Sequence, residues 1–166
     1  MLAEKCKVAV FVSGGGTNLQ AILDSRGEII KNAEICLVAS NNKDAYALER
    51  AKKHDIETFI IEDEQRLVEK LKSLEIDFIV LAGYLRILSE DFCKLYSNRM
   101  INVHPSLIPS FCGKGFYGLK VHEKALEYGV KVSGATVHFV NEIPDGGKII
   151  DQKAVRVHEG DTAEDL

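Results

Sequence analysis

The chain has 166 residues, a net charge of −4 and no apolar run that approaches the length of a bilayer span. Its composition, 46% apolar and 28% charged, is typical of one soluble globular domain. We therefore expect no membrane association, and the acidic balance argues against a general nucleic-acid binder. The first residues lack a secretory signal, and the cysteines form no C-x-x-C pair, so we expect reduced thiols, a cytoplasmic location and no metal site. The cysteines are Cys6, Cys36, Cys93 and Cys112.

Short runs rich in Val, Ile and Phe alternate with segments of helical period through the first hundred residues. This alternation predicts an α/β fold with a doubly wound, mostly parallel (Rossmann-like) sheet. A later helix is followed by two strands close together, which makes the expected sheet mixed, and we expect residues 1–166 to form a single domain. The expected strands are 7–12, 34–39, 58–61, 77–82, 100–103, 135–140 and 148–157, and the expected helices are 18–23, 44–53, 65–74, 90–96 and 121–128.

A glycine-rich turn from Ser13 to Asn18 joins the first strand to the first helix. Backbone N–H groups of such a turn point to one place, and the positive end of the helix dipole adds to their field, so the natural guest is a phosphate. No Gly-Lys-Ser/Thr follows, and Leu19 replaces the third glycine of a dinucleotide fingerprint, so a single terminal phosphate fits best. The alternative is a tight turn that needs glycine for backbone reasons alone.

The segment Ile101-Asn102-Val103-His104-Pro105 places an amide and an imidazole on one face of a strand, because alternate side chains share a face. The proline ends the strand, and sheets of this type carry their sites at the carboxyl ends of strands. An amide donor beside an imidazole suits oxyanion stabilisation and proton transfer, as in acyl or formyl transfer. A structural His-Pro turn explains the segment equally well.

Asp145 lies in a loop that follows a later strand. A carboxylate that reached His104 would favour the imidazolium. The alternative is a turn aspartate before glycine, which the local sequence favours. The remaining histidines are expected to be structural, with His138 as a satisfied interior group.

Four motifs in order resemble the phosphoribosylglycinamide formyltransferase family, and the resemblance runs from Val8 to about Asp161. It implies a folate-dependent formyltransferase of purine synthesis that uses 10-formyltetrahydrofolate as co-substrate and needs no metal. Its partners are then small molecules, and no oligomeric state is specified. The motifs are Ser13-Gly-Gly-Gly-Thr-Asn-Leu19, Leu81-Ala-Gly-Tyr-Leu-Arg-Ile-Leu88, Asn102-Val-His-Pro-Ser-Leu-Ile-Pro109, and Gly134-Ala-Thr-Val-His-Phe-Val140 followed by Asp145-Gly146-Gly147.

The resemblance also implies roles for individual residues. Asn102, His104 and Asp145 match the catalytic set, and Arg66 is a further candidate for contact with folate. The residues that match the site for the acceptor's phosphate are Gly16, Thr17 and Asn18. The residues that match the folate pocket are Leu85, Arg86, Ile87 and Leu88, together with Asn141, Glu142, Ile143 and Pro144 in a closing loop.

Two other functions remain open. Formyltetrahydrofolate deformylase shares the Asn-x-His core but passes the formyl group to water, and a non-catalytic nucleotide- or folate-binding module would need only the glycine turn. The resemblance also implies a longer chain, because the family continues well beyond residue 166. Asp161-Thr-Ala-Glu164 has the pattern of a helix start with a capping box, so we expect the formyltransferase domain to be truncated at its C-terminus.

Overall fold

A computed structural model describes residues 5–166, which form two compact units. The first unit ends at Arg86, and the second runs from Ile87 to Leu166. The expectation about a secretory signal depends in part on residues 1–4, which lie outside the described residues. The longest helices among residues 5–166 have ten residues, and none has the length and hydropathy of a membrane span.

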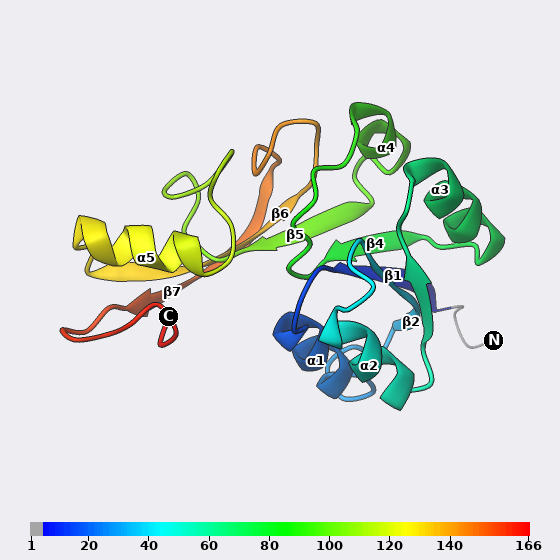
Figure 1. The fold of residues 1–166 in the computed structure, drawn as a ribbon, viewed down its shortest axis with the longest axis horizontal. Coiled ribbons are helices and arrows are strands. Elements are labelled where there is room, and N and C mark those ends of the chain that lie inside the picture. Colours follow the sequence, from blue (N-terminus) through cyan, green and yellow to red (C-terminus); the bar gives the residue numbers. More distant parts are fainter. Residues whose placement is uncertain (1–4) are drawn as a thin grey trace. The chain divides into compact units, whose positions relative to one another are not determined.

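The first unit alternates strands and helices around a parallel sheet. Its strand order is β3-β2-β1-β4, and each neighbouring pair is parallel. Helices α1 and α2 lie on one face of these strands and α3 on the other (Figure 1). The elements are β1 (Cys6–Val12), α1 (Thr17–Asp24), β2 (Ala33–Ser40), α2 (Tyr46–Lys53), β3 (Glu57–Ile60), α3 (Glu64–Ser73) and β4 (Phe78–Leu81).

Burial on both faces explains why β1 is almost entirely apolar. Val10, Phe11 and Val12 have no exposed surface, and burying each such side chain contributes about 1.5–3 kcal/mol. Parallel strands end at the same edge, so the segments that follow β1 and β4 meet there. The Leu85 amide donates a hydrogen bond to Ser13 Oγ at 2.8 Å. The glycine turn and the run after β4 are therefore neighbours within this unit.

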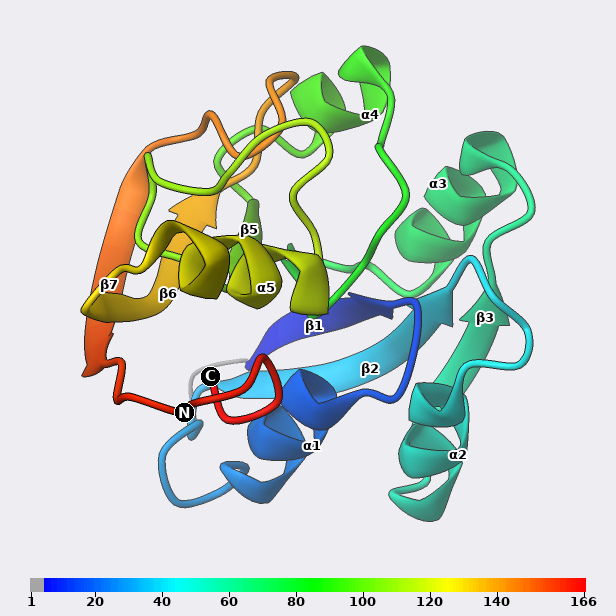
Figure 2. The same cartoon turned by 60° about the vertical axis from the view of Figure 1, so that its left-hand side comes forward.

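The second unit is built on antiparallel strands. Strand order is β5-β6-β7, and in the β5–β6 register Asn102 lies opposite His138 and His104 opposite Thr136. Helix α5 runs next to β6 in both ribbon views (Figures 1 and 2). The elements are α4 (Glu90–Leu95), β5 (Met100–His104), α5 (Leu119–Tyr128), β6 (Val132–Phe139) and β7 (Ile149–Arg156).

The predicted fold class is confirmed: parallel strands with helices on both faces come first, and antiparallel strands follow. Strand β6 begins at Val132, three residues before the expected start, because the Val157 amide donates to the Lys131 carbonyl at 3.1 Å and begins the pairing there. The helix start expected at Asp161 stays a prediction. Its carboxylate accepts from the His158 amide, three residues earlier, and a turn follows.

Gly134 is required by the close pairing of β6 with β7. A Cβ atom at this position would lie 2.1 Å from the Lys153 carbonyl oxygen and 2.9 Å from Leu107 Cδ2. We expect Gly134→Ala to lower the free energy of unfolding in urea by about 1–3 kcal/mol, since backbone must move to admit the methyl group. A Cβ atom at Gly14 would meet no atom within 4 Å beyond its chain neighbours, so Gly14→Ala should change the free energy of unfolding by less than about 0.5 kcal/mol. Equal stabilities of the two variants would contradict this account of the pairing.

Candidate active site

The Asp145 carboxylate is the meeting point of the polar groups of the second unit. Its side chain is 13% exposed. Oδ2 accepts from the Gly113 amide at 2.8 Å and lies 3.4 Å from His104 Nδ1. Oδ1 accepts from Asn102 Nδ2 at 3.5 Å and lies 3.6 Å from His138 Nε2. The structure therefore brings the three predicted catalytic residues together.

A long-range backbone bond and the geometry of the loop explain how Asp145 reaches a strand that lies more than forty residues earlier. The Val140 amide donates to the Met100 carbonyl at 2.9 Å, which keeps the β6–β7 connection beside β5. Asp145 has φ 55°, the left-handed region that Asp tolerates better than most residues. At Gly147 a Cβ atom would lie 1.6 Å from the Phe139 carbonyl oxygen, so only glycine fits. The Asp-Gly-Gly turn both shapes the loop and aims the carboxylate.

His104 is nearly enclosed, with 3% of its surface exposed. Its Nε2 lies 2.9 Å from the Phe111 carbonyl oxygen, and its Nδ1 faces Asp145. A neutral imidazole has one N–H donor, whereas the imidazolium has two. Two acceptors, one at each ring nitrogen, therefore match the protonated ring. Pro105 and Ser106 follow directly, and Ser106 Oγ donates to the Ser110 carbonyl at 2.6 Å, which holds the loop that carries Phe111.

His138 belongs to the same cluster, and the sequence interpretation of it as a merely satisfied interior group missed this. It is 2% exposed; its Nδ1 lies 2.8 Å from the Phe139 carbonyl oxygen and its Nε2 lies 3.1 Å from Asn102 Nδ2. A neutral ring accepts from the Asn102 amide through Nε2, and a protonated ring donates to Asp145. The signal was the register: adjacent antiparallel strands place Asn102 and His138 directly opposite on one face.

The environment of Asp145 favours its ionised form. Burial acts to raise its pKa, but the hydrogen bond from His138, the Gly113 amide and the charge of His104 more than offset this. Its pKa therefore lies below the ordinary value of 3.8. A carboxylate that stays charged here can support positive charge on either imidazole ring.

The glycine turn of the first unit presents an unsatisfied helix start. Gly16 is the N-cap of α1, with φ 75° and no side chain to accept from the first amides of the helix. A Cβ atom at Gly16 would lie 2.6 Å from Ala47 Cβ, so the turn packs tightly on α2. Gly16, Thr17 and Asn18 thus carry open amide donors at the positive end of a helix dipole, the arrangement expected for a phosphate site.

The residues matched to folate binding fall into two groups. Leu85 and Arg86 follow β4 in the first unit, and both are exposed. Ile87 begins the second unit with 69% of its surface exposed, whereas Leu88 is buried. In the closing loop the Ile143 amide donates to Asn141 Oδ1 at 3.0 Å, and Ile143 is 59% exposed. The remaining members of this loop, Glu142 and Pro144, are also exposed.

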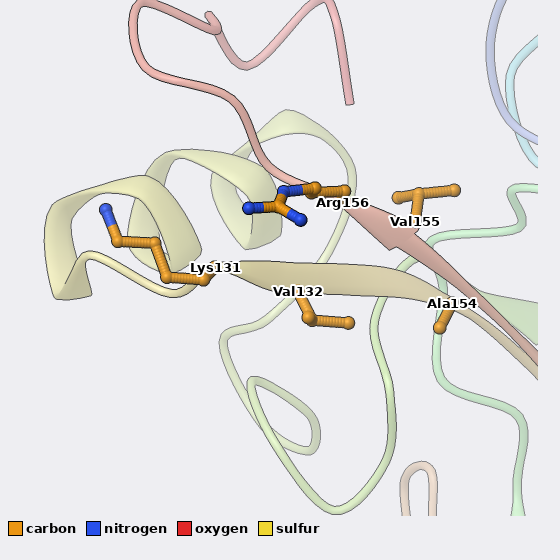
Figure 3. Close-up of a pocket in the computed structure, with 5 residues that line it drawn as sticks. All are labelled: Lys131, Val132, Ala154, Val155 and Arg156. Atoms are coloured by element: carbon orange, nitrogen blue, oxygen red, sulfur yellow. The ribbon is translucent and has the colours of Figure 1, made fainter.

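Other features of the chain give less support for a functional site. Burial and then the charge of Asp145 raise the pKa of the Cys112 thiol, which disfavours a reactive thiolate. Arg66 forms an ion pair with Glu62 on the exposed side of α3. Within residues 5–166 no group of three His, Cys, Asp or Glu side chains is placed to hold a metal ion. A shallow hollow at the start of β6 and the end of β7, lined by Lys131, Val132, Ala154, Val155 and Arg156, contains none of these residues (Figure 3).

Comparison with known proteins gives a consistent picture. The family model described as Formyl transferase matches residues 6–166. A chloroplastic phosphoribosylglycinamide formyltransferase of Arabidopsis thaliana is 40% identical over 170 residues, which cover 96% of this chain and 58% of that protein. The chain thus spans just over half the length of that curated relative.

Two solved structures share the fold. The phosphoribosylglycinamide formyltransferase of Anaplasma phagocytophilum superposes with a TM-score of 0.90 at 37% identity, over 98% of this chain and 77% of that one. A formyltetrahydrofolate deformylase of Pseudomonas syringae gives a TM-score of 0.85 at 30% identity, over 98% of this chain and 55% of that one. The deformylase is therefore the more distant of the two.

The low pKa of Asp145 predicts a pH-dependent share of the stability. A depressed pKa in the folded state stabilises the fold above the unfolded-state pKa, and this contribution disappears as pH falls through the lower folded-state value. At pH 7 we expect Asp145→Asn to lower the free energy of unfolding by about 1–3 kcal/mol. The difference between wild type and variant in urea titrations should shrink as the pH falls below about 5 and the carboxylate takes up a proton. A difference that stays constant over this range would contradict the ionised carboxylate.

Proposed function

The chain belongs to the formyl transferase family, and from that membership we propose that it transfers the formyl group of 10-formyltetrahydrofolate to the amine of 5′-phosphoribosylglycinamide in de novo purine biosynthesis. The observation that carries the proposal is the contact of Asn102 and His104 with the buried carboxylate of Asp145. An amide, an imidazole and a carboxylate in contact provide what formyl transfer needs: a donor to an oxyanion, a proton carrier and a charge to support it.

In the proposed reaction the neutral amine of the acceptor attacks the formyl carbon, and the carbonyl electron pair moves onto oxygen. Asn102 and a protonated His104 stabilise the resulting oxyanion, and Asp145 stabilises the charge on the imidazolium. The attacking nitrogen then loses a proton, the bond from carbon to N10 of the folate breaks, and N10 gains a proton. The products are the formylated acceptor and tetrahydrofolate, with no covalent intermediate on the enzyme.

The loop after β5 must take part in this reaction. The Phe111 carbonyl occupies Nε2 of His104, and the Gly113 amide occupies Oδ2 of Asp145. A substrate oxygen that accepts from Nε2 has to replace the Phe111 carbonyl. Phe111, Gly113, Gly115 and Gly118 all have positive φ, so this segment is a sharply folded loop. We propose that its displacement accompanies binding of substrate.

The other roles proposed here follow the family's pattern. Gly16, Thr17 and Asn18 hold the acceptor's phosphate, and the residues from Leu85 to Leu88 and from Asn141 to Pro144 bind the folate. Residues 1–166 act as one formyltransferase domain, which agrees with a family match that extends over both units. The partners are small molecules, and four cysteines that form no disulfide suit a cytoplasmic location.

The decisive assay follows release of tetrahydrofolate from 10-formyltetrahydrofolate, with and without 5′-phosphoribosylglycinamide. The proposal predicts release only when the acceptor is present. Release at the same rate without acceptor would indicate a deformylase instead. Binding of folate without release in either case would indicate a binding module and contradict the proposed transfer.

We expect His104→Ala to reduce kcat by about 10²–10⁴-fold, because both the proton carrier and the charge at the oxyanion are lost. KM for the acceptor should change far less, since its phosphate binds elsewhere in the chain. His158→Ala is a matched control, because His158 is an exposed histidine outside the proposed catalytic set. Circular dichroism should show both variants folded. A His104→Ala enzyme that retains more than a tenth of the wild-type kcat would remove His104 from the proposed catalytic set.

A further inference from the structure

The first three carbonyl groups of the glycine turn, those of Ser13, Gly14 and Gly15, point toward one set of donors. Asn42 Nδ2 donates to the Ser13 carbonyl at 3.4 Å, and the Ala47 amide donates to the Gly14 carbonyl at 3.1 Å. Nε of Arg50 donates to the Gly15 carbonyl at 2.8 Å. Donors from α2 and from the segment before it thus hold three successive carbonyls on one side of the turn.

The orientation of these carbonyls fixes the orientation of the amides. In a planar trans peptide the C=O bond and the N–H bond of the next residue point in opposite directions. Carbonyls that face α2 at Ser13, Gly14 and Gly15 therefore turn the following amides, those of Gly14, Gly15 and Gly16, to the opposite side. No described group of residues 5–166 accepts from these three amides. Successive free amides on one side form an anion-binding concavity.

Arg50 is the donor of this set that carries a full charge, and it is held from three sides. Its Nη1 donates to Gln20 Oε1 at 2.9 Å, and its guanidinium lies 5.0 Å from the centre of the Tyr46 ring. Its Nε holds the middle of the turn, and its Cδ is 3.4 Å from the position of a Cβ atom at Gly16. The guanidinium thus links the turn, α1 and α2 in a single arrangement.

We infer that Arg50 is a positioning residue that holds the amides of Gly14, Gly15 and Gly16 toward the phosphate of the acceptor. It acts through the Gly15 carbonyl and through Gln20, without itself touching the phosphate. The inference rests on the proposed function for the identity of the ligand, and on the hydrogen bonds of the turn for the role of Arg50. A free guanidinium would instead bind an anion directly, and its two bonds to neutral oxygens argue against that.

Arg26 provides a matched control at the other end of the same two helices. Its Nε donates to the Leu23 carbonyl at 3.2 Å, and its Nη2 lies 2.9 Å from His54 Nδ1. Arg26 therefore bridges a backbone carbonyl and a side chain, as Arg50 does, but away from the glycine turn. Arg26→Met and Arg50→Met remove the same charge and keep the same stem length.

The test combines amide exchange with inhibition by inorganic phosphate. In protein without substrates, Arg50→Met should accelerate hydrogen exchange at the Ala47 amide, which is protected by its bond to the Gly14 carbonyl and so reports the order of the turn, and Arg26→Met should not. In the transfer assay, Arg50→Met should raise KM for the acceptor and Ki for inorganic phosphate about tenfold or more, with kcat and KM for the folate within about twofold. Arg50→Lys, which can bond the Gly15 carbonyl but not Gln20 as well, should restore part of the loss.

The two parts of the experiment separate the inference from the proposed function. Unchanged exchange in Arg50→Met, or equal effects of Arg50→Met and Arg26→Met, would overturn the positioning role. A loss of kcat with unchanged KM for the acceptor would also overturn it. If wild type shows no acceptor-dependent transfer, the proposed function fails, and the exchange measurement still decides whether Arg50 orders the turn.

Discussion

The second unit depends on the hydrogen bonds and ion pairs that surround the largely buried carboxylate of Asp145. Removing Asp145 from water costs free energy unless donors replace the lost hydration. The Gly113 amide, the Asn102 amide and two imidazole rings supply them. The β5–β6 register, the Asp-Gly-Gly turn and the loop after β5 all serve this one contact. The same donors are the groups that formyl transfer requires, so the stabilising contacts and the proposed chemistry share their atoms.

In the first unit the donors are backbone amides, and they face a proposed anion instead of a carboxylate of the chain. This unit contains a helix start whose first amides have no side-chain cap, and a turn in which the carbonyls of Ser13, Gly14 and Gly15 accept from donors on one side. The amides of Gly14, Gly15 and Gly16 then face the opposite side, where residues 5–166 offer them no acceptor, and an anion binds to such an arrangement. Arg50 and the tight packing of Gly16 on Ala47 keep these amides in place. In our account one unit binds the phosphate and the other performs the chemistry.

Much of this follows from the sequence, and the remainder depends on contacts between distant segments. Alternating apolar runs and helical periods predicted every strand and helix, most clearly at β1, whose last five residues are buried. The alternation of Asn102 and His104 along a strand predicted that they share a face. The reach of Asp145 was not predictable, since its local sequence favours an ordinary turn. The β5–β6 pairing, the bond from the Val140 amide to the Met100 carbonyl, and the bonds of its own carboxylate bring it back to β5.

The roles of two residues, His138 and Arg50, were not predicted from the sequence, for the same reason. His138 became part of the cluster through its cross-strand pairing with Asn102, thirty-six residues earlier. Arg50 reaches a carbonyl thirty-five residues earlier, across the packing of α2 against the glycine turn. Neither contact has a local signature.

The most direct test of the central claim is a double-mutant cycle on single-turnover formyl transfer with His104→Ala, Asp145→Ala and the combined variant. If the carboxylate acts through the imidazolium that it stabilises, the combined variant should lose no more rate than the slower single variant. Losses that multiply would show that the two residues act independently, and the account of a single cooperative cluster would then be wrong.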